Sequence, residues 1–261
     1  MMVRLSWAVA THPGLRRDSN EDAYATRPDL GLFLVADGMG GHAAGEIASS
    51  VAAQTIELFS NDTRLRDMNR TWPFPFEPAL SIDGNRLKAA FRLANRQIAE
   101  RMASAQELKG MATTVSAVLI DENATATATA AIGHVGDSRV YLYRGGTLRQ
   151  LTDDHSWVGE QIRSGAMTPS DARRHPWRNV VTRAISGGAD PEIDVLETPL
   201  EAGDRLLLCS DGLSGVVTED EMAALAGGDT LEGACGALVD AANAAGGPDN
   251  ITVVLIQIDA R

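Results

Sequence analysis

Cysteine is scarce in this sequence. Cys209 and Cys235 are the two cysteines in 261 residues, and neither belongs to a C-x-x-C pair. Two thiols cannot build a disulfide framework, and no Cys or His residues have the spacing of a zinc site. The sequence therefore predicts a protein of the reducing cytoplasm that folds around a hydrophobic core.

Basic residues and long apolar runs are also few. The chain has 23 Lys and Arg against 35 Asp and Glu, a formal net charge of −12. Such a charge repels the phosphates of nucleic acids and anionic membrane surfaces. No uncharged apolar run approaches the roughly 18 residues of a membrane span, and LSWAVA after Arg4 is too short for a signal peptide. We expect neither a nucleic-acid partner nor a membrane partner.

What the sequence does contain is a series of β-type runs, which either alternate in polarity or are continuously apolar. They are Leu5–Ala10, Gly31–Ala36, Thr114–Ile120, Thr125–Val135, Arg139–Tyr143, Arg205–Cys209 and Ile251–Ile258.

Helical periodicity appears in three segments. The first follows Gly45 and carries Ile47, Val51, Thr55 and Leu58 on one stripe; the second carries Leu87, Phe91, Ala94, Ile98 and Met102; the third is the Ala-rich segment Leu231–Ala245. Strands interrupted by helices without regular β-α-β alternation predict an α+β protein, in which sheets pack as a sandwich with helices outside. The length fits one domain, residues 1–261.

Two segments look irregular and predict loop-like insertions. They are residues 60–84, rich in Pro, Asn and Asp, and residues 152–188, which mix Gly, Pro, His and Arg. Within the first, the Pro-flanked aromatics of TWPFPFEP (Thr71–Pro78) either cover a neighbouring helix or form an exposed docking patch.

Carboxylates follow or precede several of the apolar runs, beside Gly or another turn residue. They are Asp37 in LVADG, Asp137 in GHVGDS, Asp211 in LLLCSDG and Asp249 in GGPDN, with Glu21 and Asp22 in NED as an earlier acidic group. A single Asp-Gly pair is commonly only a turn. Strands stacked in two sheets can bring such ends to one edge, where carboxylates about 4 Å apart would repel by around 4 kcal/mol per pair. A bound cation would reverse that sign.

The donor type selects the cation. Oxygen ligands alone favour Mg²⁺ or Mn²⁺, and no EF-hand loop occurs. Several aspartates at strand ends suggest a two-metal site, whose usual chemistry is displacement at phosphorus by a metal-activated water. Arg17, just before DSNED, could hold two phosphate oxygens. The alternative is a solvated surface arginine, and Arg139 and Arg183 have weaker claims to the same role.

Taken together, the motifs resemble the PPM-type (type 2C) metal-dependent Ser/Thr protein phosphatases, bacterial branch. The matching strings run in order from Trp7 to Ile258: RRDSNEDA, VADGMGGHAAGEIAS, GMATTVSAVLI, GHVGDSRVYLYRGG, LTDDHS, HPWRNVVTRAISGG, LLLCSDGLSGVV and GGPDNITVVLI.

The resemblance implies a four-layer α-β-β-α sandwich, with two central antiparallel β-sheets flanked by helix pairs and two metal ions in a cleft at one end. Asp37 would bridge both ions. The Gly38 carbonyl would complete the coordination of one ion, and Asp211 and Asp249 that of the other. These two core ions would be Mn²⁺ or Mg²⁺.

The resemblance also assigns roles around this core. Glu21 and Asp22 would lie near the ions through direct or water-mediated contact, and Asp137 would share a weaker third ion with Asp211. Arg17 would bind the phosphate, and residues 152–188 would form a mobile flap beside the site.

The implied activity is direct attack of a metal-activated water on phosphoserine or phosphothreonine, without a phosphoenzyme. The implied partners are phosphoprotein substrates and a bacterial Ser/Thr kinase that the enzyme opposes, and we expect a monomer. The alternative is a catalytically inactive binding module of the same fold, a class that loses metal aspartates. A cysteine phosphatase is excluded, because Gly215 and Ala241 stand where its C-x5-R loop needs Arg.

One departure from the family concerns the general acid. In eukaryotic relatives a histidine proposed for this role follows the Asp-Gly pair directly, whereas this chain has Met39 there and His42 nearby. A thioether cannot donate a proton. His42 either reaches back as the acid or packs against or caps the helix around Glu46, and we favour the structural role.

Overall fold

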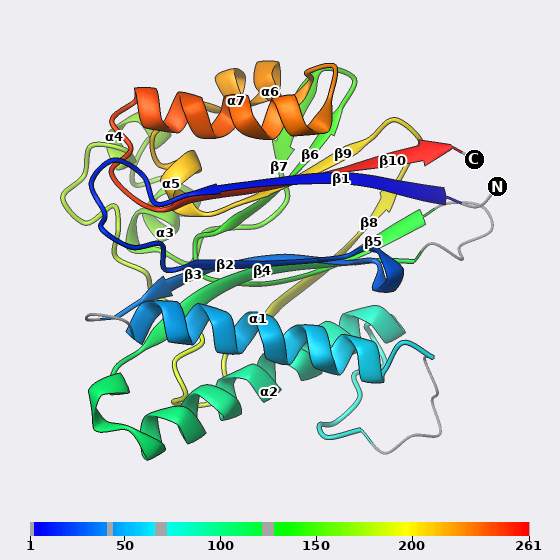
Figure 1. The fold of residues 1–261 in the computed structure, drawn as a ribbon, viewed down its shortest axis with the longest axis vertical. Coiled ribbons are helices and arrows are strands. Elements are labelled where there is room, and N and C mark those ends of the chain that lie inside the picture. The colour runs from blue at the N-terminus through cyan, green and yellow to red at the C-terminus, as the bar shows by residue number, and fades with distance from the viewer. Residues whose placement is uncertain (1–2, 41–43, 66–71, 122–127, 261) are drawn as a thin grey trace.

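Two five-stranded antiparallel sheets form the centre of the chain in the computed structural model, which describes residues 3–40, 44–65, 72–121 and 128–260. One sheet has the order β1-β10-β9-β6-β7 and the other β2-β3-β4-β5-β8. Helices α6 and α7 cover the outer face of the first sheet, and α1 and α2 cover that of the second (Figure 1). This arrangement confirms the predicted α-β-β-α sandwich.

The elements have the following bounds. The strands are β1 (Val3–His12), β2 (Asp22–Arg27), β3 (Leu32–Met39), β4 (Ala112–Ile120), β5 (Ala128–Val135), β6 (Arg139–Arg144), β7 (Thr147–Gln150), β8 (Asp194–Leu200), β9 (Arg205–Cys209) and β10 (Ile251–Ala260). The helices are α1 (Ala44–Asp62), α2 (Ile82–Ser104), α3 (Trp157–Arg163), α4 (Pro169–Ala172), α5 (Asp211–Ser214), α6 (Glu219–Ala226) and α7 (Leu231–Ala244).

Each of the seven predicted strands has a counterpart, although residues 125–127 of the predicted Thr125–Val135 lie outside the described residues. The three further strands that the sequence did not predict share one property. β2, β7 and β8 are edge strands with a single neighbour each. An edge strand is partly exposed, so its sequence lacks the apolar run or regular alternation of a central strand. The exposure of β7, which alternates between exposed and half-buried residues, illustrates this.

The core has three layers of apolar side chains. One lies between the two sheets and includes Phe33, Val118 and Val254. The other two lie between each sheet and its helices. None of the described helices is long and apolar enough to cross a membrane.

The predicted apolar stripe of α1 is only partly correct, because Ile47 and Val51 are partly buried against the core but the stripe does not extend to Leu58. Leu58 is 65% exposed, and the buried side instead carries small residues such as Ala48 and Ala52 together with Ile56. α1 packs against both β3 and α2, and small side chains allow this close approach. The stripe predicted for α2 is confirmed from Leu87 to Ile98.

The segment between α1 and α2 is shorter than the predicted insertion, because α1 continues to Asp62 and α2 begins at Ile82. Trp72 packs edge-on against Phe59 of α1, with ring centroids 6.4 Å apart, and the Phe74 ring lies 4.2 Å from the Arg96 guanidinium of α2. These aromatic residues therefore cover the helix pair. Thr71 lies outside the described residues.

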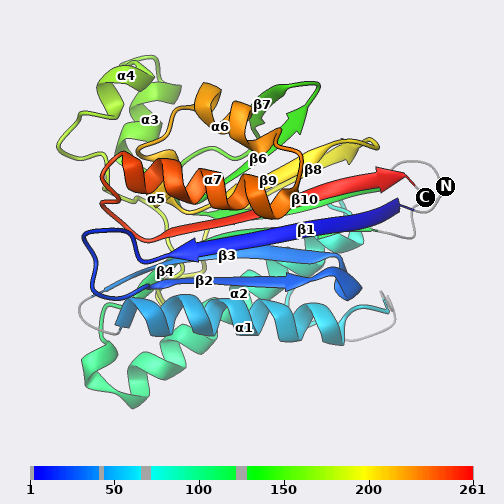
Figure 2. The ribbon, with the colours of Figure 1, turned by 45° about the horizontal axis from the view of Figure 1, so that its top comes forward.

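Residues 152–188 are not a plain loop, since they contain α3 and α4. Ser156 caps α3 by accepting a hydrogen bond from the amide of Gly159, and Thr168 caps α4 in the same way. The segment lies at the end of the sandwich where α5 begins (Figure 2).

Candidate active site

The acidic residues singled out in the sequence meet at one end of the sandwich. Asp22 at the start of β2 stands directly opposite Asp37 near the end of β3. Asp211 is the first residue of α5, and Asp249 lies two residues before β10. These ends of β2, β3, β10 and α5 lie on the same side of the molecule (Figure 1).

Asp22 and Asp211 carry the most informative oxygens. Ser210 Oγ donates a hydrogen bond of 2.8 Å to Asp22 Oδ2 and so joins the two sheets. Asp22 Oδ1 and Asp211 Oδ1 are buried, and neither has a hydrogen-bond partner in the described part of the chain. A buried carboxylate oxygen without a donor is costly, so these two atoms are candidates for contact with a cation.

The electrostatics of the cluster agree with this. Burial, followed by the charges of Asp211 and Asp249 and opposed by hydrogen bonds from Thr252 and Ser210, raises the pKa of Asp22 to about 7. Burial and the Asp249 charge raise the pKa of Asp211 to about 6, although a hydrogen bond with Asp37 opposes this. Burial and the neighbouring aspartates hold the pKa of Asp37 well above its usual range.

The donor set fits a hard divalent cation. All the clustered side-chain donors are carboxylate oxygens, which repel one another and which Mg²⁺ and Mn²⁺ prefer. Across the described residues, however, no three His, Cys, Asp or Glu side chains already stand in an ion-binding arrangement. The structure therefore brings the carboxylates together without forming a complete coordination shell.

Glu21 lies beside the beginning of α1. Its backbone carbonyl accepts hydrogen bonds from Ser49 Oγ at 2.6 Å and from the Gly38 amide at 3.2 Å. A Cβ added to Gly45 would come within 2.1 Å of Glu21 Oε2. The Glu21 carboxylate therefore packs directly against Gly45 at the start of α1. Burial raises the pKa of Glu21, with a smaller opposing effect from Arg17.

Asn250 is a structural residue of the site that sequence reasoning missed. Its Oδ1 accepts from the Glu21 amide at 2.7 Å, and its Nδ2 donates to the carbonyls of Pro13 and Ser19 at 2.9 and 2.8 Å. One buried side chain thus fixes the loop that carries Arg17. In sequence, Asn250 looks like any turn residue after Asp249.

Arg17 is the one predicted phosphate-binding arginine that lies beside the carboxylates. Its Nη2 donates a 2.7 Å hydrogen bond to Asp249 Oδ2, and its side chain is 52% exposed. The weaker candidates are engaged elsewhere: Arg139 binds Asp154 through two bonds of 2.8 and 2.7 Å, and Arg183 faces Asp194.

Asp137 lies in the turn between β5 and β6 and is 7% exposed. Burial, followed by the charges of Asp211 and Asp154, holds its pKa well above the usual range. The structure therefore places Asp137 within the electrostatic reach of Asp211, its predicted partner. His42 lies outside the described residues, and its role stays a prediction.

The raised pKa values predict the pH dependence of stability without metal. Between about pH 4, the usual Asp value, and about pH 7, folded Asp22 holds a proton that the unfolded chain has lost, so the free energy of unfolding falls as pH rises through this window. Burial lowers the pKa of His134 to about 4, so between about pH 4 and its usual value of about 6.5 this residue makes the free energy of unfolding rise with pH, opposite to Asp22.

Asp22→Asn removes the titrating carboxyl and serves as the reference. We expect the melting temperature of the chelator-treated wild type to fall more than that of Asp22→Asn between about pH 5 and pH 7, the window in which folded Asp22 keeps a proton that the unfolded chain has lost. Thermal unfolding by circular dichroism measures both. Equal slopes would show that Asp22 is already ionised in the folded protein.

Comparisons with known proteins agree with this fold. The family model of protein phosphatase 2C matches residues 15–239. The serine/threonine phosphatase Stp of Listeria monocytogenes is 36% identical over 256 residues, which cover 95% of this chain and 94% of that protein.

Two solved structures extend the likeness to three dimensions. The serine/threonine phosphatase PstP/Ppp of Mycobacterium tuberculosis superposes with a TM-score of 0.83 at 34% identity, covering 98% of this chain and 99% of that one. The catalytic domain of the phosphatase PstP in complex with two manganese ions gives a TM-score of 0.80 at 32% identity, covering 99% and 100%.

The chain belongs to the protein phosphatase 2C family. Its class is that of the serine/threonine protein phosphatases, which are hydrolases. Both the resemblance stated from the sequence and the predicted enzyme class are confirmed.

Proposed function

We propose that this protein hydrolyses phosphoserine and phosphothreonine in proteins at a site that holds two Mn²⁺ or Mg²⁺ ions. The observation that carries the proposal is the carboxylate cluster at the end of the sandwich, where buried oxygens of Asp22 and Asp211 have no donor among the residues that the structure describes. The manganese complex of the related PstP domain supports the choice of metal.

Asp37 is proposed to hold both ions, since it stands opposite Asp22 in the neighbouring strand and interacts with Asp211, which begins α5 after β9 of the other sheet. The Gly38 carbonyl would bind one ion, and Asp211 with Asp249 the other. When bound, the ions would activate a water molecule and neutralise charge on the phosphoryl oxygens.

The remaining residues act around this core. Glu21 and Asp22 would accept hydrogen bonds from water at the ions or bind them directly, and Asp137 with Asp211 would hold a weaker third ion. Arg17 would turn from Asp249 to the substrate and orient its phosphate with paired hydrogen bonds. A catalytically inactive module is disfavoured, because the predicted metal aspartates are present.

We further propose that residues 1–261 form one catalytic domain that acts as a monomer in the cytoplasm and opposes a Ser/Thr kinase. The layer of apolar side chains shared by both sheets supports the single domain.

The test of substrate class compares three phosphopeptides that differ only in the phosphorylated residue. With Mn²⁺ present, release of phosphate from the phosphoserine and phosphothreonine peptides should exceed that from the phosphotyrosine peptide by at least about tenfold. A strong preference for phosphotyrosine would contradict the proposal.

Arg17→Ala should raise KM for a phosphothreonine peptide and lower kcat/KM. The expected loss is about 1.5–3 kcal/mol, the scale of hydrogen bonds to a charged group. Arg17→Lys keeps the charge but not the paired geometry, so it should recover only part of the loss. Steady-state kinetics of the three proteins decide the question, and unchanged values for Arg17→Ala would make Arg17 a surface residue.

A further inference from the structure

Four consecutive residues, Thr152–His155, lie against residues 134–140, which contain the turn between β5 and β6. We call Thr152–His155 the clasp. Each of its residues makes a hydrogen bond to the segment 134–140. The Val140 amide donates to Thr152 Oγ1 at 3.1 Å, and the Asp153 carbonyl lies 3.0 Å from His134 Nε2. Arg139 donates two hydrogen bonds to the Asp154 carboxylate, and His155 makes two with the backbone of Gly136. Asp137 lies inside the span that the clasp holds.

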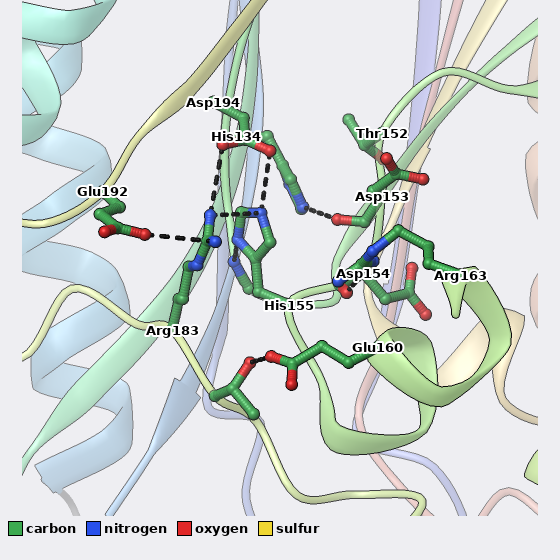
Figure 3. Close-up of polar contacts among 12 residues, drawn as sticks. His134, Thr152, Asp153, Asp154, His155, Glu160, Arg163, Arg183, Glu192 and Asp194 are labelled. Carbon is green, nitrogen blue, oxygen red and sulfur yellow. Dashed lines mark hydrogen bonds and ion pairs between the residues drawn. The ribbon is translucent and has the colours of Figure 1, made fainter. Parts of the chain in front are cut away.

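His155 makes the contact nearest to Asp137. Its backbone amide donates to Gly136 O at 2.7 Å, and the Gly136 amide donates to His155 Nδ1 at 3.1 Å. An amide nitrogen can only donate, so Nδ1 carries no proton and the ring proton sits on Nε2. Nε2 lies 3.0 Å from Asp194 Oδ2, which accepts that proton's hydrogen bond (Figure 3).

The ring of His155 is held on its other sides as well. It is 2% exposed, and the His134 ring packs against it with centroids 4.7 Å apart. Arg183 Nη1 lies 3.4 Å from His155 Nε2 and donates to Asp194 Oδ1 at 3.4 Å (Figure 3). Asp194 is at the start of β8 and is paired in register with His134. The imidazole therefore has one orientation and one tautomer.

Gly136 needs such external support. Its φ of +114° lies where side chains are strained, and an added Cβ would meet Thr114 Cβ at 2.3 Å. No side chain of its own can fix this residue, yet the peptide that follows it sets the direction of the Asp137 carboxylate. The His155 ring holds the peptide before Gly136 through its amide, and the His155 backbone amide holds the peptide after it through its carbonyl, so the ring fixes one of the two peptides that orient this residue.

We propose that His155 is a positioning residue for Asp137: by binding the Gly136 amide, it aims the Asp137 carboxylate and ties it to the segment 152–188. The inference rests on the proposed function of Asp137. A purely structural role is the competing explanation, in which the ring only fills space and links α3 to β8 through Asp194.

Two variants separate these roles, because Asn places its amide near the position of Nδ1 and Gln places its amide near that of Nε2. His155→Asn can still accept from the Gly136 amide, whereas His155→Gln keeps the group that faces Asp194. For Mn²⁺-dependent hydrolysis of p-nitrophenyl phosphate we expect kcat to fall about tenfold in His155→Gln, the scale for residues that orient a ligand, and less than about threefold in His155→Asn. KM should change less than about twofold in both.

A double-mutant cycle tests whether His155 acts through Asp137. In an Asp137→Asn background, His155→Gln should lower kcat by less than about twofold further, because the carboxylate that it positions is gone. Equal losses in the Asn and Gln variants, or an undiminished Gln effect in the Asp137→Asn background, would overturn the proposal.

Amide hydrogen exchange supplies a readout that needs no turnover. In the Mg²⁺-loaded protein, the Gly136 amide should exchange at least about tenfold faster in His155→Gln and at the wild-type rate in His155→Asn, since only the first loses its acceptor. Unchanged exchange in His155→Gln would overturn the inference. If the wild type showed no metal-dependent turnover, the proposed function would be contradicted. The exchange rates of the Gly136 amide would still show whether His155 binds it.

Discussion

Asp37→Asn is expected to lower phosphatase turnover by at least about a thousandfold. The reason is that a carboxylate shared by two ions does more than a residue that only orients a ligand, whose loss typically costs about 10- to 100-fold. Asp211→Asn should be comparably damaging. Steady-state assays with saturating Mn²⁺ measure the loss, and turnover near the wild-type rate would remove Asp37 from the centre of the site.

The same substitution should stabilise the metal-free protein. Burial and the charges of Asp22 and Asp211 hold the pKa of Asp37 well above its usual range, so its ionised form is disfavoured in the fold. A neutral amide of the same size removes that repulsion. In a chelator at about pH 8 the melting temperature should rise by about 2–4 °C for each kcal/mol gained.

Added Mn²⁺ provides the matched comparison for Asp37→Asn. It should raise the melting temperature of the wild type, because a ligand that binds only the folded state stabilises it. The melting temperature of Asp37→Asn should rise little with added Mn²⁺, because the variant has lost the carboxylate proposed to hold both ions. A variant that is less stable than wild type in chelator would show that Asp37 is not repelled by its neighbours.

Gly38→Ala is the second change with a large expected effect, and it acts on folding. A Cβ at Gly38 would lie 2.1 Å from the carbonyl oxygen of Gly45 and 2.6 Å from that of Glu21. Both are backbone atoms that cannot rotate away, so β3 and the start of α1 would have to separate. We expect a loss of about 4 kcal/mol or more in the free energy of unfolding, the range seen for severe core defects.

Gly236→Ala is the control for this substitution. Gly236 lies within α7, and an added Cβ there would meet none of the described atoms within 4 Å. Alanine in a helix interior should therefore stabilise the protein by about 0.5–1 kcal/mol. Denaturant unfolding compares the two variants, and wild-type stability of Gly38→Ala would contradict the close approach of β3 and α1.

Sequence reasoning succeeded where burial is continuous. Central strands such as Leu206–Cys209 in β9 are flanked on both faces, so their apolar runs are clear. The edge strands β2, β7 and β8 could not be found in this way, because their residues are largely half-exposed. The buried side of α1 was also missed, because it carries alanine rather than large side chains.

The same distinction holds for the site. Asp37 and Asp211 were found because each comes at the end of an apolar run or just after it, and such strand ends meet at one edge. Asn250 and His155 could not be found by that pattern, since their roles depend on hydrogen bonds to loops far away in the chain. A polar loop residue carries no periodic signal of which distant amide it will bind.

The two-metal site is tested most directly by titrating Mn²⁺ into metal-free protein, with binding heat and hydrolysis of a phosphothreonine peptide measured on the same samples. We expect two tightly bound ions in the wild type, turnover that rises only as both sites fill, and loss of both tight sites in Asp37→Asn. Full turnover in chelator-treated protein, or two tight ions retained in Asp37→Asn, would contradict a two-metal site centred on Asp37.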